Sequence, residues 1–192
     1  MKRPLQLVLG LVLGAVLTCA LVALLGLTLF RSTVMAASSS VQAEPGEADR
    51  VAQAIAEITV PAGYTGAVAV QFADFDVAGY NGPDGHSHIY LFQLPPKWHV
   101  DQAELERQWE TSLDDLGISA GPDMQVIAQD SVTIRGQATT LVTSEGDNGA
   151  GERIRSANAA FQGKDGQALV SFSGLAASWD TTMIEAFIAA MR

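Results

Sequence analysis

The chain has 192 residues, of which 11 are basic and 21 acidic, giving a formal net charge of −10. Every acidic residue lies at or after Glu44, so residues 32–192 carry eight basic and 21 acidic residues. That balance of −13 argues against binding to nucleic acid or to anionic lipid headgroups. The only cysteine, Cys19, lies within an apolar run, which excludes a disulfide and a cysteine nucleophile from the rest of the chain.

Residues 5–30 form an uncharged, predominantly apolar run. A helix of that length spans the roughly 30 Å hydrocarbon core of a bilayer with some room for tilt. The run therefore predicts a single transmembrane helix after a short N-terminus at residues 1–4. Lys2, Arg3 and the amino terminus outweigh Arg31 on the other side, so the N-terminus is expected in the cytoplasm and the C-terminal domain outside.

Two other interpretations of this segment were considered. Val34-Met35-Ala36 has the small-residue character of a signal cleavage site, but the apolar run exceeds the usual 7–15 residues of a signal peptide, which favours an uncleaved anchor. A lipoprotein signal needs a small residue before its cysteine and polar sequence after it. Here Thr18 precedes Cys19 and an apolar stretch follows, so lipid attachment is excluded.

Residues 31–46 are rich in serine and alanine and end in Pro45-Gly46, which predicts a flexible linker. Residues 47–192 then form the extracytoplasmic domain. Its first expected elements are a short amphipathic helix and a hairpin of two strands around the turn at residues 81–85. A capping pattern and an apolar stripe predict a second helix. The expected bounds of these elements are residues 47–58, 67–80, 87–94 and 101–117.

The second half of the domain is expected to be mostly strands. Arg135-Gly136 predicts a tight turn, residues 145–151 an acidic, glycine-rich loop, and residues 163–166 the turn of another hairpin. Asp180 is expected to cap a C-terminal helix with an apolar face. The strands are expected at residues 124–128, 132–134, 138–143, 154–162 and 168–173. Hairpins outnumber strand–helix–strand units, so the fold class is α+β with a mostly antiparallel sheet and packed helices.

Three segments resemble the PsbP-like fold family of small extracytoplasmic accessory proteins and lipoproteins. They are Leu94-Pro95-Pro96-Lys97-Trp98, the mid-domain segment at residues 132–138, and Trp179-Asp180 before the last helix. The first departs from the family, in which a proline–tryptophan element usually opens the domain; here residues 60–64 hold that position. The resemblance implies a non-catalytic accessory or binding domain held at a membrane, as a fold-level analogy.

His86-Ser87-His88 is the strongest local candidate for a metal site. Residues at i and i+2 of a strand point to one face, and imidazole is a common ligand of zinc and copper. Asp76, or Asp74, would supply a third ligand if the hairpin register places it across from His88. No cofactor is expected apart from such a divalent metal, and two solvent-facing histidines are the simpler explanation.

The acidic loop at residues 145–151, with Glu145, Asp147 and the adjacent Glu152, has oxygen ligands suited to calcium, but it lacks the regular spacing of a calcium loop. The sequence contains no motif typical of a catalytic nucleophile or of nucleotide binding. Whether the chain is an enzyme is therefore open, and a protein without catalytic activity is favoured. Trp98 and Tyr64 are the candidate contact residues for a partner.

These observations lead to one expected function and two alternatives. The expected function is a membrane-anchored, extracytoplasmic, non-catalytic accessory or binding domain, held by the lipid bilayer through residues 5–30. Its partner would be a membrane-protein complex or an envelope component, and the lack of disulfides suits a bacterial envelope. The alternatives are a metal or small-ligand sensor that uses the His-x-His hairpin, and an envelope hydrolase.

Overall fold

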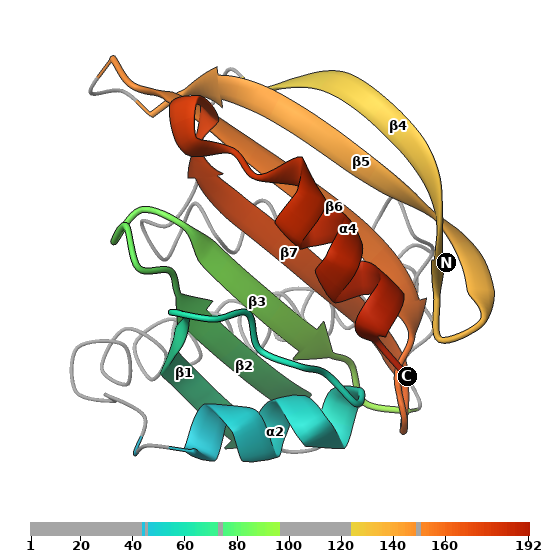
Figure 1. Cartoon of the computed structure of the whole chain (residues 1–192). Helices are drawn as coiled ribbons and strands as arrows, with labels where there is room; N and C mark the ends of the chain where they lie inside the picture. Colours follow the sequence, from blue (N-terminus) through green and yellow to red (C-terminus); the bar gives the residue numbers. More distant parts are fainter. Residues whose placement is uncertain (1–43, 45, 73–74, 97–123, 149–150) are drawn as a thin grey trace, which may run out of the picture. The chain divides into compact units, whose positions relative to one another are not determined.

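A single antiparallel sheet of seven strands is the framework of the domain in the computed structural model (Figure 1). The structure describes residues 44, 46–72, 75–96, 124–148 and 151–192. The chain divides into two units, Met1–Ser40 and Val41–Arg192, and the described residues all belong to the second. The predicted transmembrane helix at 5–30, the predicted helix at 101–117 and most of the linker lie outside the described residues. Within the described ranges, no helix is both long and apolar enough to cross a bilayer.

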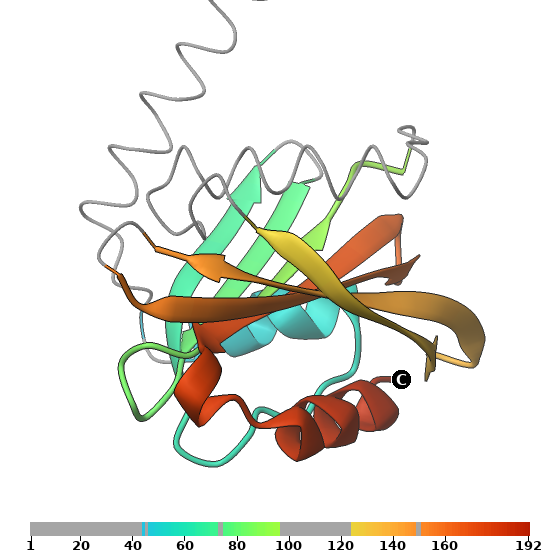
Figure 2. The same cartoon turned by 90° about the horizontal axis from the view of Figure 1, so that it is seen from above.

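The strands follow the order β1-β2-β3-β7-β6-β5-β4 across the sheet. Their bounds are β1 Thr65–Phe72, β2 Phe75–Asn81, β3 His88–Gln93, β4 Gln125–Ile134, β5 Gln137–Asp147, β6 Arg153–Gln162 and β7 Gln167–Leu175. Helices α2 (Glu47–Ile55) and α4 (Thr181–Ala190) lie on the same face of the sheet (Figure 2), and a short 3-10 helix, η1 (Ala176–Ser178), precedes α4. The predicted α+β class with an antiparallel sheet is confirmed.

The main core fills the space between the helices and the sheet. Alternation along the strands sends one set of side chains toward the helices, including Ile89, Leu91 and Phe172, each at most 1% exposed. From α4, Phe187 meets Phe172 edge-to-face with ring centroids 5.6 Å apart. Asp180 caps α4 as predicted, because its carboxylate accepts a hydrogen bond of 2.9 Å from the Met183 amide.

The structure corrects the first predicted hairpin. The run at residues 67–80 is two strands, β1 and β2, paired with Phe72 opposite Phe75. The chain therefore builds three strands before residue 94 where two were predicted. The sequence around the reversal, Phe72-Ala73-Asp74-Phe75, contains no glycine, proline or asparagine, and a single aspartate is a weak turn signal, which explains the error. The predicted turn between residues 81 and 88 is confirmed, since Asn81 pairs with His88.

Two strands expected at residues 124–128 and 132–134 are instead one strand, β4. Its polar centre, Gln129-Asp130-Ser131, is exposed at the sheet edge, where polar residues do not end a strand. The predicted turn at Arg135-Gly136 is confirmed, with positive φ of 53° and 77° at the two residues, as a two-residue hairpin turn of type I′ needs. β5 also runs on to Asp147 because Glu145 pairs with Arg155, so the expected acidic loop begins later than predicted.

Candidate functional site

The register of the β2–β3 hairpin separates the three predicted metal ligands. His88 lies opposite Asn81, whereas Asp76 lies opposite Gln93, five positions further along the ladder. At about 3.3 Å per residue this places Asp76 on the order of 16 Å from the His88 position. Asp74 lies outside the described residues. Among the residues that the structure describes, no group of three His, Cys, Asp or Glu could hold a metal ion.

His88 instead belongs to a local polar contact. Its Nδ1 lies 2.9 Å from the Asn81 side-chain oxygen, and its ring is stacked on that of Tyr90 with centroids 6.2 Å apart. Burial lowers the pKa of His88, and the nearby Asp84 only partly offsets this. Because an amide oxygen can only accept, the Nδ1 of His88 is the donor in its contact with Asn81. His86 is exposed in the preceding loop.

Asp84 organises that loop. Its carboxylate accepts hydrogen bonds from the Ser87 amide at 2.8 Å, the Ser87 hydroxyl at 2.7 Å and the His86 amide at 3.1 Å. Burial raises the pKa of Asp84, but these hydrogen bonds outweigh it and lower the pKa to about 2. The Ser87 hydroxyl therefore donates to a carboxylate. In a catalytic triad the serine hydroxyl donates to an imidazole that acts as its base, so Ser87 is not arranged as a nucleophile of that kind.

The two candidate contact residues, Tyr64 and Trp98, remain predictions as partner contacts. Tyr64 is half-buried and packs against the main core. Burial raises the pKa of its hydroxyl, partly offset by a hydrogen bond with Ser87. Tyr64 therefore connects the main core to the loop that Asp84 organises, through its contact with Ser87. Trp98 lies outside the described residues.

The sheet face away from α2 and α4 carries two adjacent rows of mostly polar side chains, called here the polar rows. The first row runs across four strands as Ser144, Ser156, Ser173 and His88, and the second as Val142, Asn158, Ser171 and Tyr90. Asn158 is 5% and Ser171 1% exposed. Within the described part of the chain, Asn158 Oδ1, Ser171 Oγ and Ser173 Oγ have no hydrogen-bond partner. Sequence reasoning missed these rows, because their members are spread over four strands.

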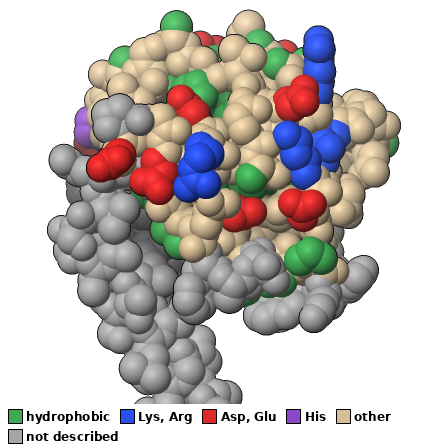
Figure 3. Space-filling view, turned by 90° about the horizontal axis from the view of Figure 1, so that it is seen from below, with side chains coloured by type: hydrophobic (Ala, Val, Ile, Leu, Met, Phe, Trp, Pro, Cys, Tyr) green, Lys and Arg blue, Asp and Glu red, His purple; other side chains and the backbone are tan. Residues whose placement is uncertain are grey.

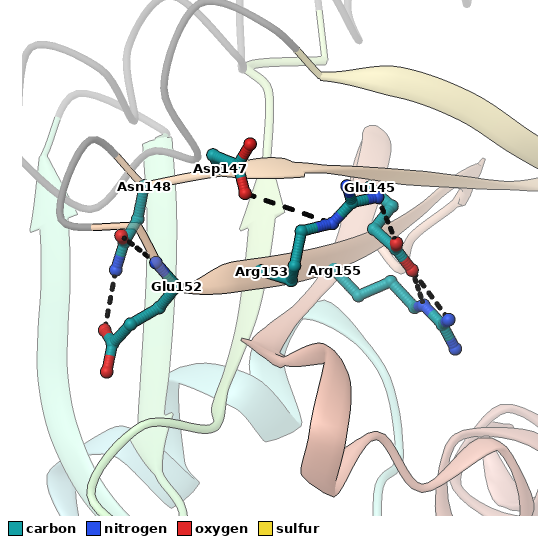
Figure 4. Close-up of polar contacts among 6 residues, drawn as sticks. All are labelled: Glu145, Asp147, Asn148, Glu152, Arg153 and Arg155. Atoms are coloured by element: carbon teal, nitrogen blue, oxygen red, sulfur yellow. Dashed lines mark hydrogen bonds and ion pairs between the residues drawn. The ribbon is translucent and has the colours of Figure 1, made fainter.

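A charged cluster lies at the far end of β5 and β6 (Figure 4). Glu145 is held by two arginines: Arg153 Nη2 contacts one carboxylate oxygen, and Arg155 Nε donates to the other at 2.7 Å. The hydrogen bonds from Arg155 and then Arg153 lower the pKa of Glu145. Both carboxylate oxygens of Glu145 are thus bound by arginine. Nearby, Asn148 Nδ2 donates a hydrogen bond of 2.8 Å to the Glu152 carboxylate. Glu145, Asp147 and Glu152 do not converge on one point as calcium ligands would (Figure 4).

An open depression of about 500 Å³ lies next to this cluster. Its lining combines the cluster with the start of β4: Met124, Gln125, Ile127, Glu145, Gly146, Asp147 and Arg153. Val126 and Ile127 are 57% and 51% exposed, and they are the large hydrophobic side chains most open to solvent among the described residues. We call Val126, Ile127 and this depression the β4 surface. It combines exposed apolar side chains with charged ones.

On the face shown in Figure 3, acidic and basic side chains of the described residues are interspersed over a mostly neutral surface. On α2, Arg50 and Glu47 form an ion pair, with their charged atoms 3.4 Å apart. Exposed pairs of this kind contribute little to stability. This face therefore lacks the single-sign patch that a polyanion or a polycation would need.

Comparison with known proteins gives one kind of match. No family model matches the chain, and no curated protein matches it. Among solved structures, the solution structure of cyanobacterial PsbP (CyanoP) from Synechocystis sp. PCC 6803 is similar, with a TM-score of 0.47 and 15% sequence identity. The match covers 73% of this chain and 87% of that one. This match agrees with the resemblance seen in the sequence, and at this TM-score and identity no statement about family or function rests on it.

Proposed function

We propose that this protein is a membrane-anchored, extracytoplasmic binding domain without catalytic activity, and that it contacts a membrane-protein complex or an envelope component through the β4 surface. The observation that supports the proposal is the exposure of two consecutive large apolar residues of β4, Val126 and Ile127, of which Ile127 lines the depression. Residues 5–30 would hold the domain at the bilayer, and residues 31–46 would let it reach its partner.

The β4 surface has the composition of a small interface. Protein interfaces combine a desolvated apolar centre with a polar rim, and arginine is enriched in them. Here the exposed apolar residues are Ile127, in the depression, and Val126, next to it in the chain, and the charged residues are Asp147 and Arg153, whose side chains are 59% and 60% exposed. Complete burial of a valine or isoleucine side chain contributes about 1.5–3 kcal/mol, so covering this pair would favour association.

Photo-crosslinking in intact membranes of the source organism tests the proposal. A photoreactive residue at Val126 should yield a discrete crosslinked product, and the same residue at the exposed Thr182 of α4 serves as the matched control. Ile127→Asn should reduce the yield at Val126 several-fold. Equal yields at both positions, unaffected by Ile127→Asn, would show that this surface has no specific partner.

The proposed topology has its own test, which the cysteine content makes simple. Because Cys19 is the only native cysteine and lies in the apolar run, a cysteine introduced at Thr182 reports on the domain alone. A membrane-impermeant maleimide should label it in intact spheroplasts. Labelling only after permeabilisation would place the domain inside and refute the topology.

A second candidate, small-ligand binding, is favoured by the polar rows. A buried polar group without a partner costs about 1–3 kcal/mol, and the rows contain three such atoms in neighbouring positions. Because the rows contain no carboxylate, lysine or arginine, a matching ligand would be a small uncharged molecule with hydroxyl or amide groups. Native mass spectrometry of the full chain released from detergent tests this, since a bound molecule adds a fixed mass and an unliganded mass counts against it.

A further inference from the structure

Among the described residues, the outer edge of β4 lacks most of the usual protection of an edge strand. β4 is the last strand of the sheet, it is ten residues long, and seven of those residues are exposed. Natural edge strands are usually short or carry lysine, proline or covering segments, because their unpaired backbone attracts other strands. β4 contains no lysine, arginine, proline or glycine, and Asp130 is its only charged residue. One protective feature is present, a bulge between Val126 and Ala128, and it leaves the segment from Ala128 to Ile134 regular.

The hairpin turn determines which backbone groups point outward. In a two-residue hairpin the pair that flanks the turn exchanges hydrogen bonds, and here that pair is Ile134 with Gln137. Bonded and non-bonded pairs alternate along the ladder, so the N–H and C=O groups of Gln129, Ser131 and Thr133 point away from β5. No other strand among the described residues pairs with this edge.

We propose that the partner adds an extended segment of its own chain to β4 as an eighth, antiparallel strand. This inference rests on the proposed function and names the kind of partner. The segment would bond to the outward groups of Gln129, Ser131 and Thr133, which is the mode of recognition called strand addition. Its side chains would supply a Lys or Arg across from Asp130 and an apolar residue that covers Ile127.

Charge selects this occupant over a second copy of the chain. Residues 32–192 carry a balance of −13, so two domains meeting edge to edge repel each other. In addition, β4 has no basic residue to place across from Asp130 of another β4. A segment with a basic side chain satisfies Asp130, and opposite charges in directly opposed positions stabilise strand pairs by roughly 0.2–1 kcal/mol.

Proline at the outward positions provides the test. Proline removes only an outward N–H at Gln129, Ser131 or Thr133 and leaves the bonds to β5 in place, as at natural edge strands. We therefore compare Gln129→Pro, Ser131→Pro and Thr133→Pro with alanine at the same three positions, in the full chain with the photoreactive residue at Val126. Variants are scored only if their urea midpoint is close to that of the parent chain.

The expected result is at least a tenfold loss of crosslinking in folded proline variants, with the alanine variants unchanged. The crosslinked peptide, sequenced by mass spectrometry, should contain a Lys or Arg within an extended segment. If folded proline variants crosslink normally while Ile127→Asn does not, strand addition is wrong and the proposed function stands. A product that joins two copies of this chain would overturn the inferred occupant, and the absence of any Val126 product would overturn both proposals.

If all three proline variants unfold, Asp130→Lys tests strand addition instead. It changes a side chain on the exposed edge without altering the backbone. A several-fold loss of the Val126 product supports a basic residue opposite Asp130. An unchanged product overturns the inference.

Discussion

The unpaired hydroxyl of Ser171 makes a sharp prediction about the polar rows. Ser171 is 1% exposed, and its hydroxyl has no partner among the described residues. An unpaired buried polar group costs about 1–3 kcal/mol, and removing it recovers that cost. We therefore expect Ser171→Ala to raise the free energy of unfolding by about 1 kcal/mol, after a small loss for the space that the oxygen leaves.

A hydroxyl on the same sheet supplies the matched control. Thr139 Oγ1 donates to the Ala160 carbonyl at 2.7 Å, so its hydrogen bond is made. Thr139→Val removes that bond and leaves the carbonyl without its side-chain donor, which should lower the free energy of unfolding by about 1 kcal/mol. The two substitutions each delete one hydroxyl, and the structure predicts opposite signs for them.

Urea unfolding of the full chain in detergent measures both. With a slope of about 2 kcal/mol/M, each change moves the midpoint by roughly 0.5 M, Ser171→Ala upward and Thr139→Val downward, with the slope unchanged. If Ser171→Ala lowers the midpoint as much as Thr139→Val does, the reasoning is refuted. The Ser171 hydroxyl would then have a partner, an ordered water or a bound molecule, which would favour the small-ligand candidate.

Three further predictions follow from other contacts. Phe187→Ala deletes the ring that packs on Phe172 and should cost about 3–5 kcal/mol in the same unfolding assay; a cost below about 1 kcal/mol would mean that α4 is not docked on the sheet. Asp180→Ala removes the helix cap and should cost about 1 kcal/mol, with Asp180→Asn largely retaining stability. Because the folded pKa of Asp84, about 2, lies below the unfolded value of about 3.9, its contribution to stability is complete above about pH 4 and is lost as the pH falls toward 2. The midpoint difference between the parent chain and Asp84→Asn should shrink over that range, and a constant difference would contradict the assigned pKa.

Local signals in the sequence were sufficient wherever one short segment decides the structure. The turn at Arg135-Gly136, the hairpin turn at residues 163–166 and the cap at Asp180 were each predicted from a few neighbouring residues, and each is confirmed. The alternating pattern also gave the α+β class. Such signals depend on backbone preferences and on hydrogen bonds between near neighbours, and both follow from the residue types in a short segment.

Predictions that depended on register or on position in the sheet were wrong. The reversal between Phe72 and Phe75 is marked in the sequence by a single aspartate, Asp74, and the polar centre of β4 suggests a break unless its edge position is known. Asp76 and the two histidines fit a metal site only in a register that the β2–β3 ladder does not adopt. A shift along a ladder moves a side chain by several ångströms, and short apolar strands do not determine that shift locally.

The sequence alone determined the acidic character of the domain, its antiparallel α+β class and the apolar run at residues 5–30 that predicts an anchor. The tertiary structure alone decided which residues meet. It placed Glu145 between two arginines, aligned the polar rows across four strands, and left β4 with its exposed Val126 and Ile127 at an open edge. The physical reason is that hydrophobicity and charge belong to each residue, whereas strand order and register arise from packing the whole sheet against its helices.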